Sequence, residues 1–172
     1  MKKIAVYPGS FDPVTYGHLD IVKRALKIFD KVIVAVAHNT EKDPLFDVSE
    51  RIEFLKRSLK GLKGVEVDDF NSLVVDYVKK KKAALVVRGL RMISDFEYEF
   101  QMALTNRKLS NDIETIFMMS SESYSYLSSK LIKEAAGLGA NLKDFDLICP
   151  VISRTVSSPS ARFRVSSNNL AL

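Results

Sequence analysis

Apolar residues form five short runs along the chain, and these runs are rich in the β-branched side chains typical of strands. The runs are residues 4–7, 32–37, 65–67, 85–87 and 115–118. They are nearly continuous apolar runs and lack the alternation of a sheet with one face in water. The pattern therefore predicts a parallel sheet that helices cover on both faces.

Segments with helical spacing lie between the runs. The residues that share one helical face are Leu19, Val22, Leu26 and Phe29, then Ile52, Leu55 and Leu59, and then Phe96, Phe100, Ala103 and Leu104. Residues 47–50 and 94–97 match a capping box, and Gly61 and Gly137 stand where helices are expected to end. The alternation predicts a single doubly wound, Rossmann-like α/β domain with a five-stranded parallel sheet. In such sheets ligands bind beyond the carboxyl ends of the strands, near the point where strand order reverses.

Length and composition fit one domain over residues 1–152. The chain has 172 residues, of which 47% are hydrophobic, and no run approaches the roughly 20 apolar residues of a membrane span. The lone Cys149 agrees with a reducing compartment, so we expect a cytoplasmic protein without a membrane partner. Residues 153–172 carry six serines and no acid, which predicts a disordered or loosely attached tail, either native or encoded by a frameshift or vector.

The net charge of +5 does not indicate a nucleic-acid binder. Three of the basic residues, Arg154, Arg162 and Arg164, lie in the tail, so the remainder of the chain is only mildly basic. We expect no nucleic-acid partner.

The segment after the first strand has the features of a phosphate cradle. Gly9 and Gly17 permit close approach of a ligand to the backbone, and the helix that begins near His18 offers free N–H groups and a partial positive charge. The segment is neither a G-x-G-x-x-G fingerprint nor a P-loop. Its chemistry predicts phosphate binding without naming the ligand.

Residues 15–18, Thr-Tyr-Gly-His, resemble the [TH]-x-G-H signature of the nucleotidyltransferase superfamily. Residues 7–13 before them resemble the opening of phosphopantetheine adenylyltransferases. Further matches follow three of the other predicted strands, at Lys42, at residues 88–91 with 95–99, and at residues 124–133. The resemblance covers residues 3–148, most of the chain.

The resemblance implies transfer of AMP from Mg²⁺·ATP to 4′-phosphopantetheine, giving dephospho-coenzyme A and pyrophosphate without a covalent enzyme intermediate. Catalysis would then rest on positioning and charge stabilisation. No acidic cluster in the motifs offers a protein metal site, so Mg²⁺ would enter with the triphosphate. The resemblance also implies a homohexamer.

The resemblance also assigns roles to residues. The implied catalytic residues are Ser10, His18, Lys42, Arg91 and Ser129. The implied ATP-binding residues are Ser10, Phe11, His18, Gly89, Leu90, Arg91, Glu99, Tyr124, Ser125, Tyr126, Leu127, Ser128, Ser129 and Lys130. The implied acceptor-binding residues are Ser10, Lys42, Leu73, Val74 and Arg88, with Arg88 on the acceptor phosphate. Alternatively, Arg88 and Arg91 only pair with Asp95 or Glu97.

Two positions depart from the family pattern. Ser10 stands where many members have Thr, and it keeps the hydroxyl. Lys130 replaces a small hydroxyl residue, and either adds a phosphate contact or faces solvent. The alternative functions are a sister nucleotidyltransferase acting on nicotinamide mononucleotide or glycerol phosphate, and a nucleotide- or RNA-binding module without catalysis. The sequence around Arg88 argues against the first, and retention of His18, Lys42, Arg91 and Ser129 argues against the second.

Overall fold

The computed structural model describes residues 2–38, 44–125 and 128–138. Five parallel strands form one sheet in the order β3-β2-β1-β4-β5. The strands are β1 (Ile4–Gly9), β2 (Lys31–Ala37), β3 (Val65–Phe70), β4 (Leu85–Leu90) and β5 (Glu114–Met119). The predicted doubly wound α/β fold with a five-stranded parallel sheet is confirmed.

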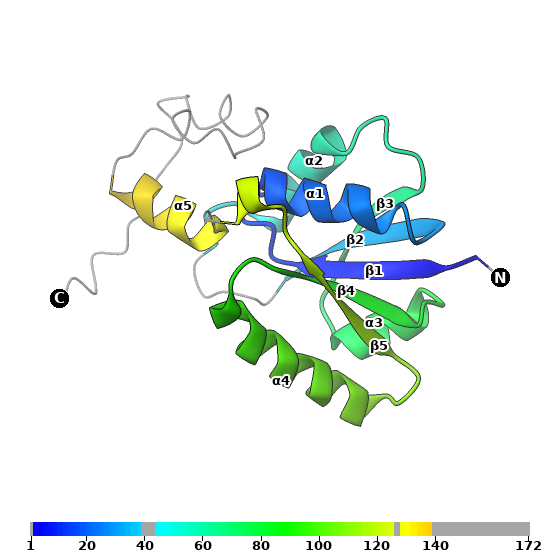
Figure 1. The fold of residues 1–172 in the computed structure, drawn as a ribbon. Helices are drawn as coiled ribbons and strands as arrows, with labels where there is room; N and C mark the ends of the chain where they lie inside the picture. The colour runs from blue at the N-terminus through cyan, green and yellow to red at the C-terminus, as the bar shows by residue number, and fades with distance from the viewer. Residues whose placement is uncertain (1, 39–43, 126–127, 139–172) are drawn as a thin grey trace.

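Helices cover both faces of the sheet (Figure 1). They are α1 (Tyr16–Ala25), α2 (Val48–Ser58), α3 (Val74–Lys80), α4 (Ile93–Leu109), the 3₁₀ turn η1 (Glu122–Tyr124) and α5 (Ser129–Gly137). Successive strand residues point to opposite faces. Tyr7 and Val34 therefore join the core under α1 and α2, whereas Val6 and Ile33 join the core under α3. Within the described residues, no helix has both the length and the apolar character that crossing a membrane requires.

The strand order reverses beside β1. From β1 the chain moves to β2 and β3 on one side of the sheet, and then returns to β4 and β5 on the other. β1 and β4 pair in parallel through Ala5–Leu85 and Val6–Val86, so their carboxyl ends lie next to each other. This reversal opens the crevice where doubly wound sheets bind ligands, and the segments 8–18 and 88–91 both begin there.

The two predicted capping boxes have different outcomes. Asp47 caps α2 as predicted, because its carboxylate accepts the Glu50 N–H at 2.8 Å and Glu50 accepts the Asp47 N–H at 2.9 Å. The box at residues 94–97 is wrong, since α4 begins at Ile93 and no side chain caps it. Asp95, the second residue of this segment, instead accepts hydrogen bonds from Arg91.

The predicted helix ends also differ. α5 ends at Gly137 as expected, but α2 ends at Ser58, before Gly61. Gly61 serves the following turn, where its φ of +90° is a conformation that glycine adopts without a steric penalty.

α4 is a helix as its spacing predicts, but none of its residues is buried. Phe96, Phe100 and Leu104 remain 43%, 45% and 48% exposed. Apolar spacing identifies a helical face without saying what covers it, and within the described residues nothing covers this face fully. The predicted domain boundary at residue 152, the tail and Cys149 lie outside the described residues.

Candidate active site

A cavity of about 250 Å³ opens at the carboxyl ends of β1 and β4. Its walls come from the loop between β1 and α1, the first turn of α1, the end of β4, and residues 120, 124 and 128–130. Polar and basic groups from three chain regions far apart in sequence therefore face one space. The site lies at the topological switch point, as the sequence predicts.

His18 enters the cavity from the first turn of α1, and its ring orientation is fixed by Thr15. The Thr15 backbone N–H donates to His18 Nδ1 at 3.0 Å, and Thr15 Oγ1 lies 3.0 Å from the same nitrogen. Because a backbone N–H can only donate, Nδ1 must carry a lone pair. The neutral ring is then protonated on Nε2, which leaves Nε2–H free to donate.

The charge state of His18 agrees with this tautomer. Burial, together with the positive charges of Arg91 and Arg88, lowers the pKa of His18 to about 3. The imidazole is therefore neutral at pH 7 and serves as a hydrogen-bond donor, since its environment disfavours a second proton.

Two buried ionic side chains fix the loop between β1 and α1. Asp12, only 1% exposed, accepts the N–H groups of Leu45 and Phe46, each at 2.9 Å, and lies 3.2 Å from Lys133 Nζ of α5. Arg51, 2% exposed, donates to the Ser10 carbonyl oxygen at 2.9 Å. The cradle is thus held from α2 and α5 before any ligand arrives.

The tight path of the loop also requires a glycine at position 9. A Cβ added at Gly9 would lie 3.0 Å from the Phe11 ring, whereas one at Gly17 would make only an ordinary contact of 3.5 Å with Tyr124. Phe11 itself is buried with a φ of +50°, a conformation that is uncommon outside glycine and clusters at functional sites.

Arg88 lies in β4, and all three nitrogens of its guanidinium group donate hydrogen bonds. Its Nε and Nη2 donate to the two Glu99 oxygens at 2.6 and 2.5 Å, and Nη1 donates to the Pro8 carbonyl oxygen at 2.5 Å. Burial disfavours the charge of Arg88, but the Glu99 carboxylate outweighs it and raises the pKa. Arg88 therefore joins the ends of β1 and β4 to α4 as a fixed cation.

Arg91 is held more loosely. It pairs with Asp95 at 3.1 and 3.2 Å, and its side chain is 37% exposed. Pairing with Asp95 was one of the alternatives left open by the sequence, whereas Arg88 pairs with Glu99 and not with Asp95 or Glu97. Both arginines still line the cavity, so pairing does not remove them from the site.

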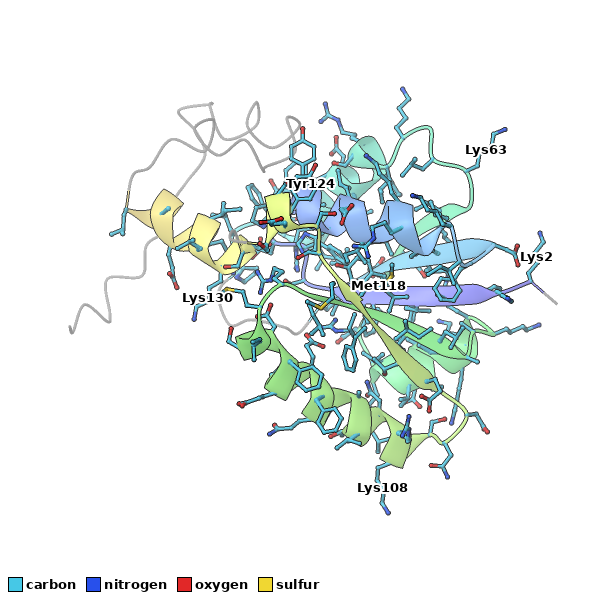
Figure 2. All side chains as sticks on the ribbon, viewed as in Figure 1. Lys2, Lys63, Lys108, Met118, Tyr124 and Lys130 are labelled. Carbon is cyan, nitrogen blue, oxygen red and sulfur yellow. The ribbon has the colours of Figure 1, made fainter. Side chains whose placement is uncertain are left out.

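The start of α5 presents three consecutive polar side chains to the cavity mouth. Ser128 Oγ accepts the Leu131 N–H at 2.9 Å and thereby caps the helix, while Ser129 Oγ donates to the Pro13 carbonyl oxygen at 2.8 Å. Lys130 projects outward (Figure 2), with its side chain 80% exposed and 4.0 Å from Glu134. A pair this exposed is weak, so Lys130 keeps most of its freedom.

A second cavity of about 390 Å³ adjoins the first. The two share Pro8, Gly9, Ser10, Arg88 and Glu99, so they meet where β1 and β4 end. The second is lined mainly by α4 and the β3–α3 region, including Phe70, Val74 and Met102. The first cavity is thus the more polar one and the second the more apolar one, and Arg88 lines both.

Most of the residues implied by the resemblance gather at these cavities. Those that line the first are Ser10, Phe11, His18, Gly89, Arg91, Glu99, Tyr124, Ser128, Ser129 and Lys130, while Val74 lines the second and Ser10, Arg88 and Glu99 line both. Leu73, Leu90 and Ser125 line neither. Lys42, Tyr126 and Leu127 lie outside the described residues.

Sequence reasoning missed the residues that orient the site, namely Asp12, Thr15, Arg51 and Lys133. Two signals were present. Asp12 is a lone acid between Phe11 and Pro13, and Arg51 falls on the same helical face as Phe54 and Leu55. A charged residue on an apolar face is costly to bury unless it is paired.

Among the described residues, no group of three or more His, Cys, Asp or Glu side chains could hold a metal ion. Glu99 is the carboxylate that lines both cavities, and Arg88 already engages both of its oxygens.

Known proteins are similar to this chain over most of its length. A profile of the cytidylyltransferase-like family matches residues 6–135. A phosphopantetheine adenylyltransferase of Caldanaerobacter subterraneus subsp. tengcongensis is 58% identical over 143 residues, which cover 83% of this chain and 89% of that protein. One from Geotalea daltonii is 53% identical over 156 residues, covering 91% and 96%.

The chain belongs to the phosphopantetheine adenylyltransferase family. Solved structures of other adenylyltransferases share the fold of this family member. A Plasmodium falciparum nicotinic acid mononucleotide adenylyltransferase complexed with NaAD has a TM-score of 0.66 at 15% identity, and covers 91% of this chain and 95% of its own. A bifunctional NMN adenylyltransferase/ADP ribose pyrophosphatase from Francisella tularensis has a TM-score of 0.64 at 15% identity, over 94% and 51%.

Proposed function

We propose that the chain transfers the AMP group of ATP to 4′-phosphopantetheine, yielding dephospho-coenzyme A and pyrophosphate. The observation that carries this proposal is the junction of the two cavities at Ser10 and Arg88. One compartment has the donors that a triphosphate requires, and the adjoining one has the apolar walls that suit a pantetheine arm. The names of the relatives at 53–58% identity support the same reaction.

In this proposal a phosphate oxygen of the acceptor attacks the α-phosphorus of ATP in line. The bond to the bridging oxygen breaks, and pyrophosphate leaves with the electron pair. His18 Nε2–H donates to an α-phosphate oxygen, and Arg91 contributes positive charge to the transition state. Fixed donors cost no reorganisation during the reaction, so the Thr15–His18 contact favours catalysis.

Arg88 is proposed to bind the acceptor phosphate. Its contacts with Glu99 and Pro8 use Nε and one N–H of each terminal nitrogen, so two N–H groups stay available for a phosphate. Val74 would contact the pantetheine arm. Lys42 is proposed to neutralise the attacking phosphate, and Ser129 and Lys130 to contact the ATP phosphates.

Mg²⁺ is proposed to arrive on ATP. The described residues fit this arrangement, because Glu99 is already paired with Arg88 and leaves the triphosphate oxygens as the main ligands. When bound, the ion would neutralise charge on the β- and γ-phosphates and on the leaving pyrophosphate.

A cytoplasmic homohexamer is the proposed assembly. The exposed apolar side chains of α4 support association with further copies, since contiguous apolar surface of this kind commonly marks an interface. Light scattering coupled to size exclusion measures the mass directly, and a monomer at micromolar concentration contradicts the proposal.

The reaction is tested by pyrophosphate release from ATP with a panel of phosphorylated acceptors. The panel contains 4′-phosphopantetheine, nicotinamide mononucleotide, nicotinate mononucleotide and glycerol 3-phosphate. We expect kcat/KM for 4′-phosphopantetheine to exceed the others by ~10³ or more, because a matched pocket discriminates strongly when both polar and apolar contacts are lost. Preference for a mononucleotide would overturn the assignment.

A further inference from the structure

Tyr7 is a buried residue of β1 whose hydroxyl the reaction described above does not use. The residue is 5% exposed and lines the first cavity. Its ring packs edge-on against Phe11, with ring centroids 5.4 Å apart, and lies 6.4 Å from the His18 ring. The phenol is therefore held in one orientation beside the group proposed to contact the α-phosphate.

The Tyr7 hydroxyl makes no hydrogen bond to any residue that the structure describes. The fully enclosed side-chain atoms without a partner in the described part of the chain are Ser110 Oγ and Ser120 Oγ. Because Tyr7 Oη is equally unpartnered but is not enclosed, it must reach open space, and the space along Tyr7 is the cavity. A buried tyrosine normally finds a partner for its O–H, so the missing partner points to a ligand.

The surroundings define the chemistry of that ligand. Burial raises the pKa of Tyr7, which keeps the phenol protonated as a neutral donor, even though Arg88 and Arg91 favour the phenolate. A Cβ added at Gly89 would lie 3.4 Å from Tyr7 Oη, so the hydroxyl lies next to the end of β4. Gly89 stands between the two arginines in sequence. A donor in this basic environment suits an electron-rich oxygen.

We propose that Tyr7 is an additional nucleotide-binding residue, whose hydroxyl donates a hydrogen bond to an acceptor oxygen of bound ATP. The oxygen belongs to the α-phosphate or to the ribose. This inference rests on the proposed function for the identity of the ligand, and it concerns binding, because the neutral phenol takes no part in bond making.

Tyr7→Phe tests the proposal, with Tyr77→Phe as its matched control. Tyr77 is also buried, but its hydroxyl donates to Asp68 at 2.7 Å and its residue lines neither cavity. Calorimetry on the full chain would measure the Kd for ATP, and thermal melting would measure stability. We expect Tyr7→Phe to weaken ATP binding about three- to tenfold, as for one neutral hydrogen bond, with Tm unchanged. Tyr77→Phe should lower Tm and leave the Kd for ATP unchanged.

Deoxy analogues distinguish the two oxygen sources. If Tyr7→Phe weakens the binding of 2′-deoxy-ATP and of 3′-deoxy-ATP as much as it weakens the binding of ATP, the acceptor oxygen belongs to the phosphate. If the effect vanishes with one analogue, the acceptor is that ribose hydroxyl. An unchanged Kd for ATP in Tyr7→Phe, or a loss of Tm like that of Tyr77→Phe, overturns the proposal. Failure of the proposed function would appear separately, as absence of adenylyl transfer by the wild-type chain.

Discussion

The loop between β1 and α1 and the helix α4 both border the site, but the described part of the chain buries the loop and leaves α4 exposed. Phe11, Asp12 and Val14 of the loop are at most 1% exposed, whereas α4 has no buried residue. The loop is closed by hydrogen bonds from α2 and α5, while α4 turns apolar side chains outward. One copy of the chain therefore fixes the loop proposed to bind phosphate, whereas the α4 wall of the second cavity stays open to further contacts in the described structure.

His18→Ala should produce the largest effect, because the loop wall positions this donor for the transition state. Turnover should fall by ~10² or more with little change in the Kd for ATP, as expected for a group that stabilises developing charge. Quenched-flow or pyrophosphate-release kinetics measure it. His38→Ala is the matched control, since His38 pairs with Asp69 and lines neither cavity. Near-normal turnover of His18→Ala would contradict the role.

Asp12→Ala should cause the largest loss of stability, because it removes a buried carboxylate that accepts two backbone N–H groups and contacts Lys133. Denaturant unfolding should show a loss of about 2–4 kcal/mol, the range for breaking a buried charged network. Asp30→Ala serves as control, since Asp30 is exposed and accepts only the Lys3 N–H in the described structure. A loss below the control would show that the loop is held mainly by packing.

The stability of the chain should depend on pH through His18. Because the folded-state pKa of His18 is about 3 and the ordinary value is 6.5, the unfolded chain binds the extra proton between these pH values. Stability is therefore full above pH 6.5 and falls as pH drops toward 3, by up to about 1.4 kcal/mol per unit. Between pH 7 and 5, His18→Gln should lose less stability than the wild type, by roughly 2 kcal/mol at most. Identical pH profiles would show that His18 is not desolvated.

Arg88→Ala removes a side chain that lines both cavities and contacts both Pro8 and Glu99. We expect the KM for 4′-phosphopantetheine to rise about tenfold or more, and the KM for ATP to change less than about threefold, since the guanidinium is assigned to the acceptor phosphate. Arg88→Lys keeps the charge but loses the two-point contact with Glu99, and should fall between wild type and Ala. Equal rises in both KM values would contradict the assignment.

Much of the fold and part of the site follow from sequence pattern. The five strands and the helix starting at Val48 are local signals, so periodicity and the Asp47 cap find them. The exposed side of α4 could not be predicted, because spacing reveals a face but not its partner. Arg51 and Asp12 were missed because their partners are distant in sequence, at Ser10 and Phe46.

Substitution of exposed apolar residues on α4 should have the smallest effect on the chain itself. Ile93 is 90% exposed and Leu104 is 48% exposed, so Ile93→Ser with Leu104→Ser removes little buried area within one copy. The free energy of unfolding at low protein concentration should change by less than about 0.5 kcal/mol per site. Lys108→Ser, on the exposed end of the same helix (Figure 2), is the control.

The same double variant should nevertheless change the assembly, because the exposed apolar side chains of α4 are proposed to contact another copy of the chain. We expect a lower mass by light scattering, and a Tm that stops rising with protein concentration, since association stabilises the folded state by mass action. Activity should fall mainly through a higher KM for 4′-phosphopantetheine, because α4 contributes more residues to the second cavity, the proposed acceptor site, than to the first, where it supplies Glu99. An unchanged mass together with an unchanged KM would show that the exposed face of α4 contacts solvent and not another copy. The difference in burial between α4 and the loop would then have no role in assembly or acceptor binding.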